Sequence, residues 1–477
     1  MALPFGTQSP ELDVLIVGAG LSGLASALKI LTKESSLKLR IIEASDVLGG
    51  QLGENGIRFL DREQFDMVSI LASVEMTPRR RSSDNEGLSR CWDLDEGVTA
   101  LPANFELERY INMLELRMNK FRSKNFNLRE RVSNMEQHIC QHLFFSKSRN
   151  FMFNLVEVVC GVPANEVLYD VFMSVCSSCG GLRMMIDFYF TYPSSFYEVS
   201  SQKLIENILN QIPFTAISLN TRAVKVEHFK NYVQVTDVDG TKHTAQAVIL
   251  AIPWNKVQKL QFDPPIPDAF LPPVASKAGK RQHCLISQFQ LRYEKSHWTE
   301  LGYSGNFLNS QPLISAHECG PSTIDGYMLH LSEDKDDVMG VVLDHLTAQL
   351  GEEMRQPLEC RCFTDELSVA LHKPQGRPWF RIIWSSSSSV GTTYRSLIGG
   401  AVESGVRAAV NALFVVRPQV VSWKDMPDMG KKGRLEGSGT GRLRGLLSRL
   451  NLYNVTFYTT FVVGIISLLN YGYERLS

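Results

Sequence analysis

The sequence predicts an α/β protein with a parallel sheet, a second domain of α+β type and a C-terminal transmembrane helix. Three observations predict this architecture. The stretch "DVLIVGAGLSGLASALKI" at 13–30 joins an apolar run, a glycine turn and a segment of helical period. Residues 220–268 alternate apolar and polar residues through short strands, with a hairpin turn at Asp239-Gly240. The segment 452–473 carries no charge and is just long enough to cross a bilayer.

Length and composition fit two folded domains. The chain has 477 residues, of which 44% are hydrophobic, so a large core can form. Its 49 basic and 50 acidic residues nearly cancel, and this balance indicates no nucleic-acid partner. No basic-then-apolar leader precedes Asp13, so we expect a protein that is not secreted and whose nine cysteines are reduced. The single CxxC pair, Cys176 and Cys179, lacks the four ligands of a structural zinc site, so we predict no metal.

The first glycine turn predicts a dinucleotide site of Rossmann type. Gly18 suits the tight turn, Gly20 the close approach of backbone to a diphosphate, and Gly23 the packing of helix on strand. The bare N–H groups and the dipole at the helix start favour negative charge. A second strand, "LRIIE", ends in Glu43, whose carboxylate can accept hydrogen bonds from both ribose hydroxyls. A glycine turn without a ligand is the alternative interpretation.

A second glycine pair makes the resemblance to a family specific. Glu43 is followed by "ASDVLGGQL", with Gly49 and Gly50. A βαβ unit followed by E-A-x-x-x-x-G-G resembles the flavin amine oxidase family, which includes the monoamine and polyamine oxidases. The resemblance implies FAD as cofactor, with contacts at Ala44, Gly50 and Gln51. Gln51 stands where the family has arginine, so it can donate to a phosphate oxygen only without charge assistance.

Two further stretches support this resemblance. Within 220–268, "VILAIP" and "FDPPIP" mark the point where the chain leaves the cofactor domain, and the backbone of Val224 is expected to contact the adenine. The segment "GGAVESG", 399–405, corresponds to a helix whose N-terminus points at the flavin. The implied contacts there are Gly400, Ala401 and Val402.

The resemblance implies a flavoprotein of the GR2-like class with discontinuous domains. The predicted FAD-binding domain comprises 10–80, 199–272 and 381–425. The predicted substrate domain comprises 81–198 and 273–380, with helices in 105–145 that cap the substrate side. A basic linker, 430–451, and a tail anchor, 452–473, complete the chain.

The C-terminal segment predicts a membrane partner. The basic, glycine-rich linker precedes the uncharged stretch, and basic flanks favour the cytosolic side. We therefore expect a tail anchor that holds a cytosolic body, with a buried or amphipathic terminal helix as the alternative. The short span with its basic flank favours the mitochondrial outer membrane over the endoplasmic reticulum. Anchored relatives often pair, so a homodimer is open.

The positions that act on the substrate depart from the family. Counting back from Trp298 places Gln288 at the position of the family's lysine, and an alternative register places Cys284 there. A glutamine can orient a water molecule, but it supplies no positive charge. One member of the family's aromatic pair falls on Leu397.

The second aromatic position and the flavin-linking cysteine also differ. If "ALHKPQG" is aligned with the family, Ser368 stands at the cysteine position and Val369 at the aromatic position. Only a shifted register would use Cys362, so we predict that FAD is bound noncovalently.

Two flavin-contacting turns are altered as well. The family's Gly-Gly turn should follow "NGIRFLD", yet no glycine occurs between Gly56 and Gly87. The family's Gly-Thr-Glu turn falls on the serine run 387–389, which makes Ser389 a candidate contact, with a flexible polar loop as the alternative.

The stretch "DFYFTYPSSFYEV", 187–199, is rich in aromatic residues. It predicts either an aromatic pocket for an amine, lined by Tyr189 and Tyr192, or an aromatic core segment. The resemblance to the family implies two alternative functions. The first is an FAD-dependent oxidoreductase that deaminates a primary or secondary amine and returns its electrons to O2 as H2O2. The second is a catalytically silent FAD-binding or membrane-anchored scaffold of the same fold.

Overall fold

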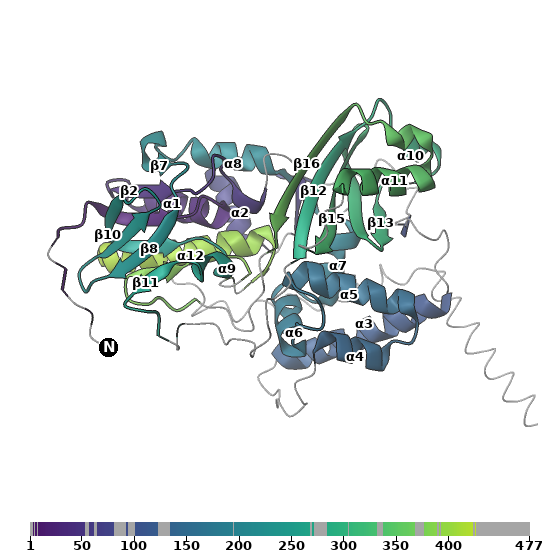
Figure 1. The fold of residues 1–477 in the computed structure, drawn as a ribbon, viewed down its shortest axis with the longest axis horizontal. Coiled ribbons are helices and arrows are strands. Elements are labelled where there is room, and N and C mark those ends of the chain that lie inside the picture. The colour runs from purple at the N-terminus through teal and green to yellow at the C-terminus, as the bar shows by residue number, and fades with distance from the viewer. Residues whose placement is uncertain are drawn as a thin grey trace, which may run out of the picture. The chain divides into compact units, whose positions relative to one another are not determined.

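The computed structural model divides the chain into two compact units, Met1–Ser422 and Trp423–Ser477. Apart from isolated positions, the structure describes 8–52, 57–61, 64–80, 92–93, 101–122, 134–193, 195–267, 284–303, 305–331, 337–367, 376–388, 391 and 393–422. The predicted linker, 430–451, and the predicted anchor, 452–473, lie outside the described residues. Ser368, Val369 and Ser389 lie outside them as well. Figure 1 shows the elements of the first unit.

An eight-stranded sheet carries the first glycine turn. Its strands are β1 (Leu12–Val17), β2 (Leu39–Ile42), β7 (Ile217–Ser218), β8 (Ala223–His228), β9 (Val233–Asp237), β10 (Lys242–Leu250), β11 (Gln261–Asp263) and β17 (Ile382–Trp384). The order is β11-β8-β9-β10-β1-β2-β7, with β17 beside β10. β1 is parallel to β2 and β10, whereas β9 is antiparallel to β8 and β10. Val14, Leu15 and Ile16 are fully buried, as expected of a central parallel strand with both faces covered.

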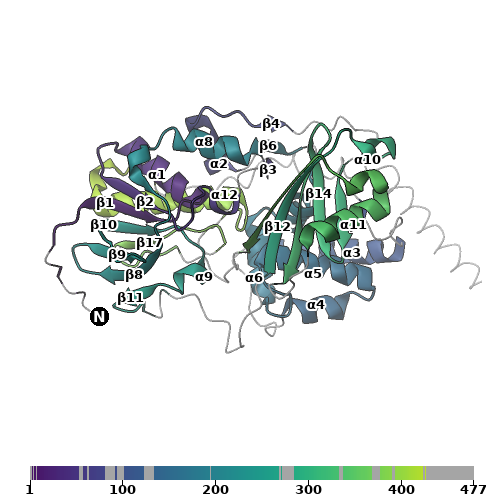
Figure 2. The ribbon, with the colours of Figure 1, turned by 45° about the horizontal axis from the view of Figure 1, so that its top comes forward.

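Helices α1 (Leu21–Lys33), α2 (Phe65–Ser73), α8 (Ser201–Leu209) and α12 (Ile398–Val416) share one apolar core with this sheet. α1 and α12 lie side by side (Figure 2). A Cβ atom at Gly405 would lie 2.4 Å from the Ser22 carbonyl oxygen, so only glycine permits this approach. The Ser26 hydroxyl donates to the Gly405 carbonyl at 3.0 Å and ties the two helices together. Short helical turns α9 (Trp254–Val257), η3 (Phe214–Ala216) and η6 (Pro418–Val420) complete this region.

α12 also has the length and apolar composition of a membrane-spanning helix. Of its most apolar window, 61% is buried inside the protein, which identifies α12 as a core helix. Among the described residues, the pair Tyr169–Ser178 and Leu182–Thr191 passes the same test only as a span bent by 80°.

A second sheet has six strands in the order β16-β12-β15-β14-β13-β5. They are β5 (Trp92–Asp93), β12 (Cys284–Arg292), β13 (Phe307–Ser310), β14 (Leu313–Gly320), β15 (Thr323–Leu331) and β16 (Glu359–Glu366). One of its apolar clusters contains residues of α11 (Val338–Leu350) and η5 (Glu352–Arg355) and Trp298 of α10 (His297–Glu300). β12 alternates buried and less buried residues because only one face of this antiparallel sheet meets that cluster.

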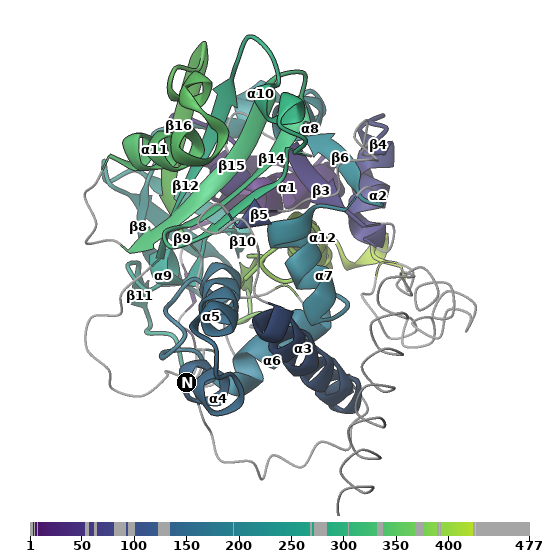
Figure 3. The same cartoon turned by 90° about the vertical axis from the view of Figure 1, so that its right-hand side faces the viewer.

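A layer of helices packs against the other part of this sheet (Figure 3). It comprises α3 (Leu101–Arg122), α4 (Met135–His142), α5 (Ser146–Cys160), α6 (Tyr169–Ser178), α7 (Leu182–Ile186) and the π-helical turn η2 (Asp187–Thr191). α3 and α4 fall in the predicted helical stretch 105–145. Cys176 and Cys179 are buried in the apolar core of this layer.

A small sheet, β3-β6-β4, adds the third group of strands. β3 (Ile57–Leu60) pairs with β6 (Tyr197–Ser200), which also pairs with β4 (Arg79–Arg80). β3 follows η1 (Gly50–Leu52) along the chain, and Arg58 on β3 forms a hydrogen bond with Gln288 on β12.

Candidate functional site

The first glycine turn adopts the geometry of a phosphate-binding turn. Gly18 has φ of +104°, a backbone conformation that side chains disfavour. Gly20 is the N-cap of α1, and a Cβ atom there would meet only the Gly50 Cα atom, at 4.0 Å. A Cβ atom at Gly23 would lie 2.1 Å from the Gly18 carbonyl oxygen. Gly18 and Gly23 are therefore required by the fold, whereas Gly20 keeps a space open.

The second glycine pair faces the first. Gly49 forms a parallel bridge with Gly20, and its N–H donates to the Ala19 carbonyl at 3.0 Å. Gly50 has φ of +58°, and a Cβ atom there would lie 3.1 Å from the Gly20 Cα atom. We call the space bordered by Gly18, Gly20, Gly49 and Gly50 the glycine crevice. Any larger residue at Gly50 would narrow it.

Glu43 lies at the end of β2, beside this crevice. One carboxylate oxygen accepts a hydrogen bond from the Ala19 N–H at 2.7 Å. The other accepts from the Ser45 N–H and hydroxyl, each at 3.0 Å. These bonds fix the carboxylate while each oxygen keeps a further lone pair for a ligand hydroxyl. Ala44 follows it and is exposed.

Val224 occupies a β-bulge. Ala223 pairs with Asp237 and Lys225 with Thr236, so Val224 has no residue opposite it on β9. A bulge leaves the extra residue outside the ladder of hydrogen bonds. The predicted contact between the Val224 backbone and the adenine therefore falls on this bulge and stays a prediction.

The start of α12 holds the next group of predicted contacts, Gly400, Ala401 and Val402. Leu397 is the N-cap, and a Cβ atom at Gly400 would lie 2.3 Å from the Tyr394 carbonyl oxygen. The Ser387 hydroxyl donates to the Leu397 carbonyl at 2.7 Å, which joins the serine run to the helix start. Ser385, Ser386 and Ser388 are buried, so these three serines lie inside the protein.

These features fit a dinucleotide cofactor such as FAD. The crevice is bordered by main chain, and a Cβ atom at Gly20 or Gly50 would occupy part of it. A diphosphate requires an open space of this kind, where it can approach the backbone closely. The N-terminus of α1 borders the crevice and favours negative charge. The contact roles of Gly18, Gly20, Gly23, Glu43, Ala44, Gly50, Gln51, Val224, Ser389, Gly400, Ala401 and Val402 remain predictions.

Gln51 and Gln288 meet at the edge of this region. The Gln51 side-chain amide donates to the Glu366 carbonyl at 2.9 Å. The Gln288 side-chain amide donates to the Gln51 carbonyl at 3.2 Å, and its oxygen accepts a hydrogen bond from Arg58. Gln288 therefore lies beside the second glycine pair. The alternative candidate, Cys284, is buried in the core of the helical layer, where burial raises the pKa of its thiol to about 12.

The aromatic stretch is packed into the interior. Phe188, Tyr192 and Phe196 form a buried cluster with Phe59, and Tyr189, Tyr394 and Leu397 pack against it. The Tyr189 carbonyl accepts hydrogen bonds from the hydroxyls of Tyr192 at 2.7 Å, Ser315 at 2.7 Å and Tyr327 at 3.0 Å. Burial raises the pKa of Tyr189, so its phenol stays neutral. Of the two interpretations, core packing describes Phe188, Tyr192 and Phe196.

Four residues in this region were not singled out from the sequence: Arg58, Phe59, His317 and Asp325. The buried His317 ring lies 4.7 Å from the Phe59 ring and 4.6 Å from the Tyr192 ring, measured between centroids. His317 and Asp325 are opposite each other on β14 and β15. Arg58 and Phe59 lie on β3, within the stretch "NGIRFLD" that precedes the expected glycine turn, and no short sequence motif marks them.

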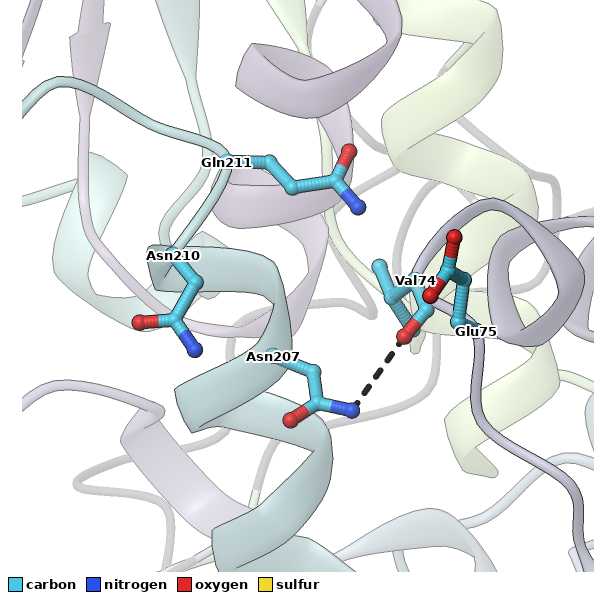
Figure 4. Close-up of a pocket in the computed structure, with 5 residues that line it drawn as sticks. All are labelled: Val74, Glu75, Asn207, Asn210 and Gln211. Atoms are coloured by element: carbon cyan, nitrogen blue, oxygen red, sulfur yellow. Dashed lines mark hydrogen bonds between the residues drawn. The ribbon is translucent and has the colours of Figure 1, made fainter.

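A surface pocket elsewhere is lined by Val74, Glu75, Asn207, Asn210 and Gln211 and has a volume of about 290 Å³ (Figure 4). The Asn207 amide donates to the Val74 carbonyl at 3.2 Å, and the Gln211 amide donates to the Ser73 carbonyl at 2.7 Å. These bonds satisfy carbonyls at the C-terminus of α2, which the helix itself leaves open. The pocket contains no predicted site residue and is explained by helix capping.

Comparison with known proteins assigns the chain to a family. The model of the family described as flavin containing amine oxidoreductase matches residues 58–343. This match begins after the glycine crevice, so the crevice is separate evidence.

Curated relatives are distant in sequence. The human lysine-specific histone demethylase 2 is 21% identical over 425 residues, covering 82% of this chain and 48% of the demethylase. The chain thus spans about half the length of that relative. AofH of Mycobacterium tuberculosis, a provisionally named flavin-containing monoamine oxidase, is 23% identical over 449 residues, covering 83% of this chain and 95% of AofH.

Solved structures share the fold. Cyclohexylamine oxidase from Brevibacterium oxydans IH-35A superposes with a TM-score of 0.69 at 16% identity, covering 86% of this chain and all of the oxidase. Putrescine oxidase bound to putrescine superposes with a TM-score of 0.64 at 17% identity, covering 84% of this chain and 98% of that structure. Since the family match spans more than half of the sequence, this chain belongs to the flavin-containing amine oxidoreductase family.

Proposed function

We propose that this chain is an FAD-dependent amine oxidase that deaminates a primary or secondary amine. The observation that carries the proposal is the glycine crevice with Glu43 beside it, in a member of the flavin-containing amine oxidoreductases. FAD is the cofactor of this family; it accepts the hydride equivalent from the carbon next to the amine nitrogen, and O2 then takes up the electrons as H2O2. The names of cyclohexylamine oxidase, putrescine oxidase and AofH support an amine as substrate.

The residues of the chain hold the cofactor without a covalent bond in this proposal. The main chain at Gly18 and Gly20 takes the diphosphate, and Glu43 accepts hydrogen bonds from ribose hydroxyls. The Val224 backbone meets the adenine, and the N-terminus of α12 favours electron density at the nearby part of the ring.

In this proposal the region around Tyr189 and Leu397 orients the substrate and excludes water, and the buried Tyr192 supports it from behind. Amine oxidation of this kind depends on a desolvated neutral amine held close to the acceptor, with little acid–base chemistry. The aromatic cluster and the neutral phenol of Tyr189 provide an apolar wall. They favour an apolar amine over a polyamine.

One observation favours a second function, a catalytically silent FAD-binding protein or membrane-anchored scaffold. Gln288 stands at the position of the family's lysine, and Leu397 at one position of its aromatic pair. Loss of these side chains removes aids to catalysis without touching the glycine crevice. Binding and turnover therefore need separate measurements.

Two measurements on the purified full-length protein separate these functions. An absorbance spectrum should show bound flavin, and H2O2 release should rise with an apolar primary or secondary amine from a panel. Bound flavin without H2O2 for any amine would favour the silent binder. A protein that stays colourless after incubation with FAD would contradict both functions.

We also propose that the segment 452–473 anchors the protein in a membrane, with the body facing the cytosol and the mitochondrial outer membrane favoured over the endoplasmic reticulum. Support comes from the uncharged span and the basic residues that precede it. A reporter fused to 430–477 should localise to mitochondria, whereas a matched reporter fused to 430–451 should stay cytosolic. A cytosolic location of both reporters would contradict the anchor, and reticular staining would contradict the choice of organelle. Homodimer formation belongs to the same proposal and is tested by the mass of the detergent-solubilised protein.

A further inference from the structure

A charged side chain contacts the position of the missing lysine. The Arg58 guanidinium, on β3, donates one hydrogen bond to the Leu52 carbonyl at 3.0 Å and another to the side-chain oxygen of Gln288. The Gln288 amide nitrogen in turn donates to the Gln51 carbonyl. Arg58 and Gln288 thus form a chain of hydrogen bonds that ends on the residues directly after Gly49 and Gly50. We call Arg58, Gln288 and the Gln51 carbonyl the Arg58 chain.

The direction of these bonds fixes the Gln288 amide. Its oxygen faces the guanidinium and its nitrogen faces the Gln51 carbonyl, so the amide has one orientation. A guanidinium stays protonated in proteins, whereas the amide is neutral at every pH. The positive charge beside Gln288 therefore comes from Arg58, which is 230 residues away from Gln288 in the sequence and belongs to another sheet.

Burial and a nearby carboxylate act on the Arg58 guanidinium in opposite directions. Burial lowers the pKa of Arg58, and the negative charge of Asp325, a buried residue of β15, partly opposes this effect. The Asp325 carboxylate also accepts a hydrogen bond from the Gln290 amide at 2.7 Å, so its charge is shared between partners. A half-buried guanidinium acts more strongly on its neighbours than an exposed one does, because less water screens its charge.

We propose that Arg58 is a positioning residue that replaces the family's lysine: through Gln288 it supplies the positive charge that promotes electron transfer from the reduced cofactor to O2. This inference rests on the proposed function. Two electrons and two protons pass to one O2 molecule, which leaves as H2O2, and the cofactor returns to its oxidised form. A nearby positive charge favours the first electron transfer because that step gives O2 a negative charge.

Reoxidation can be measured without any amine. The full-length protein with bound FAD is reduced anaerobically by light and EDTA, and reoxidation is followed after mixing with O2. Arg58→Met should slow reoxidation about tenfold, which is one power of ten for about 1.4 kcal/mol of lost charge stabilisation. Arg58→Lys should stay within about threefold of wild type because it keeps the charge. The matched control, Arg292→Met, removes an exposed arginine of β12 paired with Glu359 and should leave the rate unchanged.

A rescue separates this role from a merely structural one. In the double variant Arg58→Met/Gln288→Lys, a lysine stands at the family position, and reoxidation should return to within about threefold of wild type. The reduction potential of the bound FAD should become more negative in Arg58→Met and recover in the double variant. A structural role of Arg58 predicts no recovery of either quantity.

A variant that should speed up reoxidation covers the case in which Arg58→Met does not fold. Asp325→Asn removes the counter-charge while keeping the shape, so reoxidation should be faster than in wild type. Reoxidation within twofold of wild type in folded Arg58→Met, a missing rescue, or slower reoxidation in Asp325→Asn would each overturn the inference. A protein that holds no FAD would overturn it as well. A protein that reoxidises as predicted but oxidises no amine would leave it standing and contradict only the proposed function.

Discussion

The glycine crevice and the region around Gln288 differ in how closely they follow the family. The crevice has the backbone geometry that the glycine spacing predicts, with Gly18 and Gly50 at positive φ, Gly20 at the helix start and Glu43 beside them. Around Gln288 the lysine, a glycine turn and an aromatic position have all changed. The crevice is bordered by main chain, and a side chain at Gly20 would occupy its space, whereas the second region is made of side chains, which can be exchanged singly.

From this difference we infer that cofactor binding and turnover depend on separate parts of the fold, which mutation can test separately. A main-chain site is lost at once when a Cβ atom enters it. A site made of side chains can lose the family's lysine and receive a positive charge from another strand instead, as we propose for Arg58 of β3 and Gln288 of β12. The predictions below separate the two regions.

The largest effect is expected from Gly23→Ala. The added Cβ atom would lie 2.1 Å from the Gly18 carbonyl oxygen, so α1 must move away from β1. Overpacking of this kind costs about 3 kcal/mol or more of unfolding free energy when backbone must shift. Thermal unfolding of the FAD-free protein measures it. Gly320→Ala, where a Cβ atom meets nothing within 4 Å, is the matched control and should be neutral.

A smaller effect, on binding alone, is expected from Glu43→Gln. The amide keeps the size of the side chain but loses charge-assisted bonds to the Ala19 N–H and to ribose hydroxyls. The affinity for FAD should fall about tenfold, equivalent to about 1.4 kcal/mol, in a fluorescence titration. Glu34→Gln, which alters an exposed carboxylate bonded to Ser36, should leave the affinity unchanged. Equal affinities of the wild type and Glu43→Gln would contradict the assigned role of Glu43.

The smallest effect is expected from Tyr327→Phe in the aromatic region. The change removes a hydrogen bond of 3.0 Å to the Tyr189 carbonyl, which keeps two other donors. The free energy of unfolding should fall by about 1 kcal/mol in urea. Tyr293→Phe, which loses a bond of 2.9 Å to the Met354 carbonyl, should cost the same. Only Tyr327→Phe should change the KM for an amine, and equal KM values would place Tyr327 outside the substrate region.

The sequence predicted the parts of the site that depend on local backbone. The spacing of Gly18, Gly20 and Gly23 after an apolar run defines a strand, a turn and a helix within a few residues, and the structure has them there. Glu43 follows because the next strand must end at the same edge of the sheet. The family of the chain was predicted from residues 13–53, which include the second glycine pair, together with 220–268 and 399–405.

The rest depends on contacts between distant segments. Arg58 reaches Gln288 only because β3 and β12 lie near each other, and no spacing in the sequence encodes that contact. The aromatic stretch 187–199 could not be assigned to core or pocket from composition, since both are apolar. The turn η2 and the hydroxyls of Ser315 and Tyr327, which lie on other strands, decide the packing of Tyr189 and Tyr192.

The central claim is that the glycine crevice holds FAD, and the most direct test is an FAD titration of Gly20→Ala and Gly20→Val beside the wild type. A Cβ atom at Gly20 meets only the Gly50 Cα atom at 4.0 Å, so both variants should fold, at a cost of about 1 kcal/mol or less for the altered helix cap. The affinity for FAD should fall stepwise, by about a hundredfold for valine, because the side chain fills the space of the diphosphate. Folded variants that bind FAD as tightly as the wild type would contradict the claim.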